Sequence, residues 1–212
     1  ETYRDDAYSL DKLTTEQYIH DERFEVICVA VKFNDEPTEC FSGTFEETKK
    51  FLETFDWSNS YALAHNMKFD GAILTWKFGI QPQHYLDTML MGQAINGTLF
   101  STSLDSMANA YLEKQKGNYV NEVVGLRRKY FTADQMDNFK KYCINDVNLT
   151  SDLFWKLRDT FSEVEFGLIN VTLSMYLNPN FKLDTAALKE RLVEVVQEKN
   201  LLLLKAGVPR EV

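Results

Sequence analysis

The segment Lys140-Lys141-Tyr142-Cys143-Ile144-Asn145-Asp146-Val147 lies within a longer stretch, 133–157, that contains neither proline nor glycine. Apolar residues recur along this stretch at helical spacings and would cover one broad face of a helix. They are Met136, Phe139, Ile144, Val147, Leu149, Leu153 and Phe154. The pattern predicts a long amphipathic helix. Tyr142 and Asp146 stand four residues apart, so they would lie one turn above the other on it.

A phenol and a carboxylate held one turn apart on a helix can act together on one metal-bound water molecule. The phenol can hydrogen-bond a water molecule, while the carboxylate holds the metal ion that activates that water. Ordinary amphipathic helices also contain this spacing by chance, so the pair alone does not identify a functional site. Its meaning depends on the acidic residues upstream.

Composition indicates a globular protein. With 212 residues the chain fits one domain, or one domain and part of a second. Its apolar runs fall short of the roughly 20 residues that a membrane span needs, so we expect no membrane partner. Cys28, Cys40 and Cys143 are odd in number and follow no metal-binding spacing, and two of them, Cys28 and Cys143, lie in surroundings typical of buried thiols. Because the first residues are polar rather than a secretory leader, we expect a soluble protein in a reducing, cytoplasmic compartment.

The formal charge of −9 argues against a protein that binds nucleic acid by bulk electrostatics alone. It does not exclude nucleic acid, because divalent cations bound to carboxylates become the largest local charge. Basic residues cluster just before and within the 133–157 stretch; they are Lys114, Lys116, Arg127, Arg128, Lys129, Lys140 and Lys141. A nucleic-acid contact and a solvated surface are equally good interpretations of this cluster.

The first 160 residues alternate strand and helix patterns, which predicts an α/β domain. Residues 1–3 resemble the end of a strand, and 85–88 an edge strand or the start of a helix. Further strands are predicted over 24–33, 38–42 and 61–65, the first two forming a hairpin. Additional helices are predicted over 44–55, 69–78 and 103–112, and loops over 4–23 and 117–125.

After residue 160 the pattern changes to two helices, 161–177 and 184–205, without a strand between them. We therefore predict an α/β domain over 1–160 and a C-terminal helical extension over 161–212, which would begin another domain. The chain starts without methionine and stops just after a helix, so we expect it to be part of a longer polypeptide.

Three carboxylates share a context that suggests metal chemistry. Glu1 ends the first predicted strand, Asp70 follows a strand-to-helix junction, and Asp146 lies on the late helix. Two hard cations about 3.5–4 Å apart, held by such carboxylates, stabilise both the attacking and the leaving oxygen of an in-line phosphoryl displacement. Tyr142 could orient the attacking water in a site of this kind.

The ordered motifs Glu1-Thr2, Asn66-x-x-Phe69-Asp70 and Tyr142-x-x-x-Asp146 resemble the DEDDy 3′–5′ exonuclease superfamily, the proofreading domains of DNA polymerases and their relatives. The resemblance covers about residues 1–157. It implies an RNase H-like fold, a mixed β-sheet flanked by helices. The segment 173–192 further resembles the junction between the exonuclease and polymerase domains of phage family A DNA polymerases, so 161–212 would begin a polymerase domain.

The resemblance also implies a role for each motif residue. Glu1 and Asp146 would bind the metal ion that activates the nucleophile, and Asp70 would serve a second metal ion, directly or through water. Tyr142 would hydrogen-bond the attacking water or hydroxide. The cofactors would be two divalent cations, Mg²⁺ or Mn²⁺, because oxygen ligands suit both.

The substrate implied is the single-stranded 3′ end of DNA, hydrolysed to nucleoside monophosphates during proofreading in the cytoplasm of a host cell. Asn66 and Phe69 would face the terminal nucleotides, and the backbone at Thr2 would approach the 3′ end. Two alternatives stay open. One is a 3′–5′ exoribonuclease or a free-standing DNA exonuclease of the same fold. The other is a catalytically silent module that binds single strands or supports a polymerase structurally.

One departure from the family concerns its first motif, Asp-x-Glu, whose Asp would lie two residues before Glu1. We therefore expect the chain as written to bind metal weakly and to cleave poorly; equal metal-dependent turnover with the upstream residues restored would refute this. Three simpler local interpretations are that Asp70 caps the following helix, that His65 is a hydrogen-bonded histidine at a strand end, and that Asp87 is structural.

Overall fold

The computed structural model describes residues 1–207 of the chain. These form two compact units, the first spanning Glu1–Asn178 and the second beginning at Pro179. The last five residues of the predicted extension, 208–212, lie outside the described residues. Within the described part of the chain, no helix combines the length and the apolar character that crossing a membrane requires.

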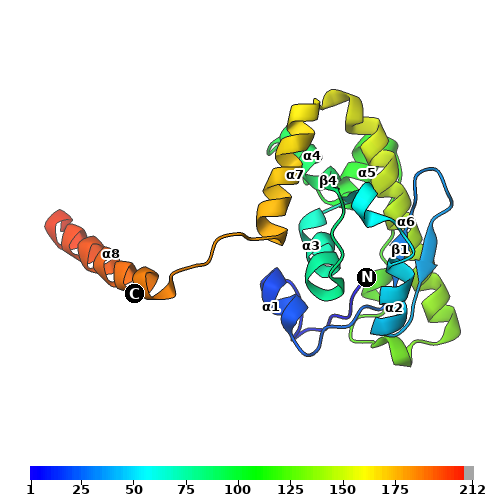
Figure 1. Ribbon diagram of the computed structural model, residues 1–212, viewed down its shortest axis with the longest axis horizontal. Coiled ribbons are helices and arrows are strands. Elements are labelled where there is room, and N and C mark those ends of the chain that lie inside the picture. The colour runs from blue at the N-terminus through cyan, green and yellow to red at the C-terminus, as the bar shows by residue number, and fades with distance from the viewer. Residues whose placement is uncertain (208–212) are drawn as a thin grey trace. The chain divides into compact units, whose positions relative to one another are not determined.

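The longest helix of the first unit, α6 (Ala133–Leu157), confirms the prediction for 133–157 and runs along one side of the unit (Figure 1). It begins with a capping box, in which the Thr132 side chain accepts the Gln135 backbone N–H and the Gln135 side chain accepts that of Thr132. Its apolar stripe faces the core; the buried residues are Phe139, Tyr142, Cys143, Leu149, Thr150, Leu153 and Leu157. The sequence pattern therefore places α6 correctly at both ends.

The predicted hairpin is confirmed, although its first strand is shorter than expected. Strands β1 (Val29–Val31) and β2 (Glu39–Phe41) pair antiparallel, with Ala30 opposite Cys40. The preceding residues, 24–28, instead bond the N-terminal segment: Ile27 N–H donates to the Glu1 carbonyl at 2.9 Å. The first residues of the chain thus run antiparallel to the segment that leads into β1.

A β-α-β unit forms the centre of the domain. Strands β3 (Tyr61–Ala64) and β4 (His84–Asp87) pair in parallel and are connected through α3 (Met67–Ala72) and the single π-turn Ile73–Lys77. The strand predicted over 61–65 is confirmed. The helix predicted over 69–78 begins two residues earlier, at Met67, because Asn66 takes a left-handed conformation with φ of 73°.

The single mixed β-sheet that we expected is not formed within residues 1–207. The four strands make two ladders, β1–β2 and β3–β4, which do not hydrogen-bond to each other. A cleft lined by residues of β1 and β3 lies between them. The α/β class is correct, but the fold holds its strands as separate antiparallel and parallel pairs.

One helix was not predicted, and another was anticipated only as one of two interpretations of 85–88, a segment that forms the end of a strand and the start of a helix. The loop expected over 4–23 contains α1 (Thr15–His20), which buries Tyr18 and Ile19 and starts with a capping box between Thr14 and Gln17. Helix α4 (Thr88–Asn96) follows β4 directly. The remaining helices agree with the predicted starts: α2 (Phe45–Leu52) and α5 (Leu104–Leu112). Short 3₁₀ turns cover Trp57–Asn59, Tyr119–Asn121, Arg128–Tyr130 and Arg158–Thr160.

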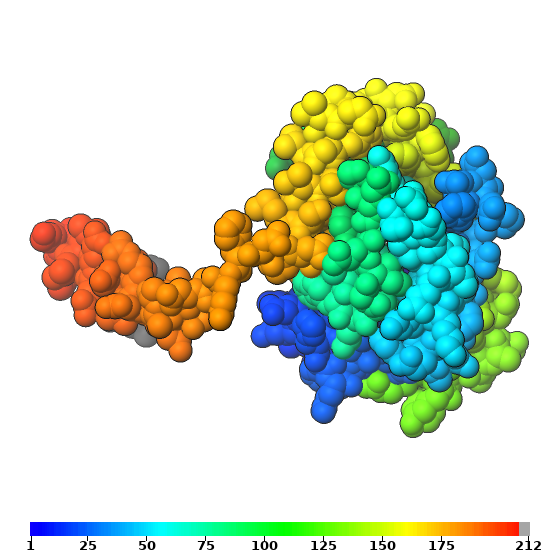
Figure 2. All heavy atoms as spheres, in the orientation of Figure 1, coloured from blue at the N-terminus to red at the C-terminus, as the bar shows by residue number. Residues whose placement is uncertain are grey.

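Helix α7 (Glu163–Leu177) packs within the first unit, whereas the sequence analysis assigned it to the extension after residue 160. The Asn170 side chain accepts the Tyr85 backbone N–H at 2.9 Å, so α7 covers the outer edge of β4. The contact with α3 is close at Gly71: a Cβ there would lie 2.7 Å from Leu177 Cδ1, so the Leu177 side chain would have to shift. In the space-filling view α7 joins the end of α6 at one end of the unit, and α1 lies towards the other (Figure 2).

Removal of α7 is expected to unfold the first unit. A chain of residues 1–160 would lose Ile169, Leu173 and Leu177, which are at most 9% exposed. Each such side chain contributes about 1.5–3 kcal/mol when buried, a large share of the 5–15 kcal/mol typical of a domain. Urea unfolding followed by circular dichroism should give a cooperative transition for 1–178 but not for 1–160. Equal midpoints for the two chains would place the boundary at 160 after all.

The second unit consists of the segment from Pro179 and helix α8 (Thr185–Ala206). The Asp184 side chain caps the helix by accepting the Ala186 and Ala187 backbone N–H groups at 3.1 and 3.0 Å. None of its side chains is buried; the strongly exposed apolar ones include Leu188, Leu192, Val193, Leu201, Leu202 and Leu204. The helix predicted over 184–205 is confirmed, and it presents its apolar residues to solvent.

Candidate active site

A cleft of about 690 Å³ lies in the first unit between the two strand ladders and α6. Residues from both ladders, α3 and α6 line it, and much of the lining is apolar. Among the residues predicted from the sequence to form a site, five line this cleft: Glu1, Thr2, Phe69, Asp70 and Asp146. Folding therefore brings together parts of all three sequence motifs.

Only one of the two oxygens of the Asp146 carboxylate has a partner within residues 1–207. One oxygen, Oδ2, lies 3.0 Å from the Lys116 ammonium, whereas Oδ1 is buried and has no hydrogen-bond partner among the described residues. Burial raises the pKa of Asp146 to about 6, although Lys116 opposes this shift. A buried acceptor without a partner is uncommon and costly, and a bound cation is one way to satisfy it.

Asp70 projects from the first turn of α3. It does not cap the helix, because Asn66 occupies the N-cap position, so the capping interpretation of Asp70 is wrong. The side chain is open to solvent but lies in a recess surrounded by protein atoms. The resulting desolvation raises the pKa of Asp70 to about 6.

The N-terminal segment is fixed by hydrogen bonds on both sides. The Glu1 backbone nitrogen donates to the Cys28 carbonyl at 2.8 Å, and the Glu1 carbonyl accepts Ile27 N–H. The Thr2 hydroxyl lies 2.9 Å from the Tyr18 hydroxyl of α1. These bonds hold the half-buried Glu1 side chain at the edge of the cleft, where Asp70 and Asp146 also lie.

Tyr142 and Asn66 are not part of the cleft lining. Tyr142 is 7% exposed, and the Lys116 ammonium lies 5.4 Å from the centre of its ring. Burial raises the pKa of Tyr142 to about 12, so its hydroxyl stays protonated at neutral pH and can donate a hydrogen bond. Asn66 serves the backbone turn into α3, and its N–H donates to Asp87 Oδ1 at 3.0 Å.

Lys116 is the residue of this region whose position the sequence did not reveal. It belonged only to a general basic cluster, yet it contacts both Asp146 and Tyr142. Burial lowers the pKa of Lys116, but the neighbouring Asp146 outweighs this effect and raises it, so the side chain carries a positive charge. Asp146 lies 30 residues further along the chain, and no local sequence pattern predicts that it pairs with Lys116.

Apart from Lys116, three of the six residues of the basic cluster form ion pairs. Lys114 pairs with Asp152 at 2.6 Å, and Arg127 pairs with Glu25 at 3.1 Å. Lys141 pairs with Asp137 at 2.5 Å on the surface of α6. Arg128, Lys129 and Lys140 have no ion pair among the described residues, so part of the cluster keeps unneutralised charge, and both interpretations of it stay open.

Asp87 and His65 make hydrogen bonds that hold the backbone next to the site in place. The buried Asp87 carboxylate accepts backbone N–H groups from the first residues of both α3 and α4. The two ring nitrogens of His65 lie 2.9 Å from the Thr88 hydroxyl and the Thr102 carbonyl oxygen. Both residues therefore have the structural roles expected from the sequence.

The donor set of the cleft fits hard divalent cations. Carboxylate oxygens are the ligands that Mg²⁺ and Mn²⁺ prefer, and the unpartnered Asp146 Oδ1 supplies a free one. The oxygens of Glu1, Asp70 and Asp146 are not gathered within 4.8 Å of one another, as a closed site for one ion would have them.

Comparison with known proteins identifies the family. A family model of the DNA polymerase A exonuclease type, described as 3′–5′ exonuclease, matches residues 2–161. A search of curated proteins found no match. The matched region covers well over half of the 212 residues and contains the Asn66 to Asp70 and Tyr142 to Asp146 motifs. The chain therefore belongs to the 3′–5′ exonuclease family of the DNA polymerase A type, within the DEDDy superfamily.

Proposed function

We propose that this chain is the proofreading domain of a DNA polymerase and removes nucleoside monophosphates from the 3′ end of DNA with the help of two divalent cations. The observation that carries the proposal is the cleft in which Glu1, Asp70 and Asp146 meet, with one Asp146 oxygen buried and unpartnered. Family membership supports hydrolysis at a 3′ end. The apolar lining of the cleft supports contact with unstacked bases rather than with duplex DNA.

Each residue has a role in this proposal that its surroundings support. Glu1, Asp70 and Asp146 would hold the cations, which when bound would supply a nucleophilic hydroxide and neutralise the charge that develops on the phosphate. The role of Tyr142 rests on its position one turn before Asp146 on α6 and not on the cleft lining, to which it does not belong. Kept as a phenol by its raised pKa, it would donate a hydrogen bond and so orient the attacking water. Phe69 offers an aromatic surface to a terminal base. Lys116 holds the Asp146 carboxylate in place through Oδ2.

The direct test is release of mononucleotides from single-stranded DNA labelled at its 3′ end, and from RNA of the same sequence, with Mg²⁺ or Mn²⁺. Because the first motif lacks its Asp in the chain as written, we expect slow stepwise shortening that depends on the cation and is stopped by a chelator. Faster hydrolysis of DNA supports proofreading, whereas faster hydrolysis of RNA would favour an exoribonuclease. Binding of both strands without hydrolysis would leave a catalytically silent module.

Tyr142→Phe is expected to lower kcat about 10²-fold with little change in KM, because a correctly oriented water is worth about that much in rate. The phenyl ring should keep its packing against Phe139, whose ring centre lies 6.3 Å away, so stability should be unchanged. Steady-state kinetics on labelled single-stranded DNA measure the effect. Tyr130→Phe is the matched control, since Tyr130 is 63% exposed and does not line the cleft. Equal loss in both variants would contradict the assignment.

A further inference from the structure

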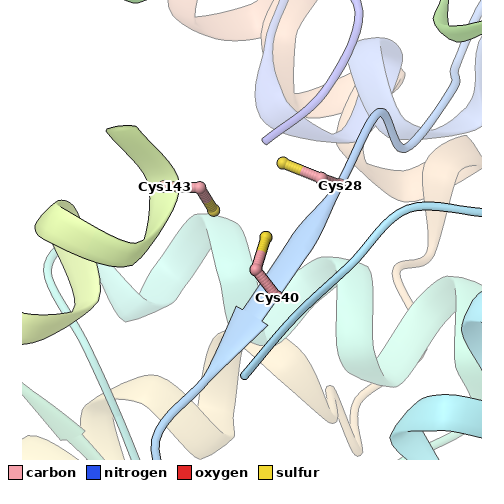
Figure 3. A group of neighbouring side chains, drawn as sticks. All are labelled: Cys28, Cys40 and Cys143. Atoms are coloured by element: carbon pink, nitrogen blue, oxygen red, sulfur yellow. The ribbon is translucent and has the colours of Figure 1, made fainter. Parts of the chain in front are cut away.

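The three cysteines of the chain, Cys28, Cys40 and Cys143, meet at one point of the first unit. Their sulfur atoms all lie within 4.8 Å of one another. They come from separate elements, namely the segment before β1, strand β2 and helix α6, and Figure 3 shows the three thiols directed towards a shared space. The sequence contains no other cysteine, so folding gathers every thiol of the protein in one place.

The hairpin geometry explains how the cluster arises. Ala30 lies opposite Cys40, and Cys28 precedes Ala30 by two residues, so Cys28 and Cys40 share one face of the hairpin. Helix α6 packs against the hairpin and presents Cys143 from its buried side. A hydrogen bond of 2.6 Å from the Thr38 hydroxyl to Asn148 Oδ1 fastens the hairpin to α6. The spacing of the sulfurs is thus set by the packed framework.

The cluster can be reached by an ion. Cys28 and Cys143 are 1% and 6% exposed as whole residues, but both contribute to the lining of the cleft, and Cys40 is half-buried. Their surroundings are therefore dry enough to favour a desolvated metal–thiolate bond and open enough to admit its metal. A group of three small apolar residues would fill the same space without requiring sulfur at each position.

We propose that Cys28, Cys40 and Cys143 form a binding site for one thiophilic cation, of the class that includes Zn²⁺ and Cu(I). Three thiolates select such ions over Mg²⁺ and Mn²⁺, which the carboxylates prefer. Sulfurs bound to one zinc ion at about 2.3 Å lie about 3.8 Å apart in tetrahedral geometry, so the observed spacing needs only small side-chain movements. The fourth position is left to water from the cleft. On binding, the thiol protons pass to solvent.

Occupation of this site would stiffen the elements that carry the carboxylates. The Cys28 carbonyl accepts the Glu1 backbone nitrogen, and Cys143 adjoins Tyr142 on α6, one turn before Asp146. The cation would therefore cross-link the hairpin to α6 beside the cleft. The proposal depends on the cysteines alone and stands independently of the exonuclease assignment.

The test is titration of the reduced chain of 212 residues with Cd²⁺, a spectroscopic substitute for Zn²⁺, and separately with buffered Cu(I). A large excess of Mg²⁺ is present throughout, so that hard-cation sites on the carboxylates do not contribute. We expect ultraviolet charge-transfer absorption that saturates at one ion per chain, with the same stoichiometry in native mass spectrometry. In Cys40→Ser the affinity should fall about 100-fold or more, because a first ligand matters at least as much as the outer partners of a metal site.

A second measurement covers the case in which a buried substitution impairs folding. Alkylation of the unsubstituted chain, read out by peptide mass spectrometry, should slow at all three cysteines together when Cd²⁺ is bound. Circular dichroism identifies which of Cys40→Ser and Cys143→Ala remain folded. The proposal is overturned if no charge-transfer band appears, or if a folded variant with one cysteine replaced binds the ion as tightly as the parent chain. It is also overturned if Cd²⁺ protects fewer than three thiols from alkylation.

Discussion

Asp146→Asn is expected to lower the exonuclease rate about 10³-fold, which corresponds to roughly 4 kcal/mol of lost transition-state stabilisation. Asparagine keeps the size of the side chain but removes the negative charge and one of the two oxygens. Oδ1 of the Asp146 carboxylate is the buried oxygen that has no protein partner. Cation binding measured by calorimetry should weaken together with the rate, because both depend on this carboxylate.

The matched control is Asp152→Asn. Asp152 lies on the same helix and also pairs with a lysine, Lys114, but it does not itself line the cleft and its side chain is 44% exposed. This variant should retain the rate of the parent chain. The thermal unfolding of Asp146→Asn should also stay close to that of the parent, since the raised pKa of Asp146 shows that its charge is unfavourable in the fold. Full activity in Asp146→Asn would remove the basis of the proposed function.

Asp87→Ala is expected to destabilise the first unit by about 4 kcal/mol. The Asp87 carboxylate is 1% exposed and accepts backbone N–H groups of Asn66, Met67, Met89 and Leu90 at 3.0, 2.9, 2.8 and 3.4 Å. Removing it leaves buried donors unsatisfied at about 1–3 kcal/mol each, and it also removes the cap of α4. Urea unfolding measures the loss.

A control separates this effect from ordinary capping. Thr44→Ala removes an exposed capping box at the start of α2 and should cost about 1 kcal/mol. Asp87 also ties the end of β4 to the start of α3, so its loss should displace Asp70 and reduce activity under conditions in which the variant is still folded. A change in stability of less than 1 kcal/mol for Asp87→Ala would show that water replaces the carboxylate easily.

Local signals predicted some elements to the residue and missed others. Helix α6 has a capping box at Thr132, a long apolar stripe and no interruption, so several independent signals agree. Helix α1 has the same kind of capping box at Thr14, but it is only six residues long and too short to show a period. The predicted boundary at residue 160 differs from the end of the first compact unit, Asn178, for another reason: the contacts that bring α7 into this unit, such as Tyr85 with Asn170, join distant parts of the sequence.

The same distinction holds for the site. Asp70 and Asp146 belong to spaced motifs, so their sequence context pointed to them, and the cleft brings them together. Lys116 and the three cysteines have no such motif. Lys116 comes into contact with Asp146 only when the chain folds, and Cys28 lies close to Cys143 only because the hairpin packs on α6. Tyr142 was assigned a role beside Asp146, and its buried position outside the cleft lining could not be read from helical spacing alone.

The division of the strands into two ladders affects how the isolated protein should be handled. Within residues 1–207, β1 and β3 each pair on one side only, whereas the outer edge of β4 is covered by α7. Unpaired strand edges next to an apolar surface are templates for self-association. The net charge of −9 keeps chains apart in dilute buffer, but the Debye length shrinks from about 10 Å at 0.1 M salt to about 3 Å at 1 M. Concentrated stocks should therefore remain clear at low ionic strength and turn turbid as salt is added.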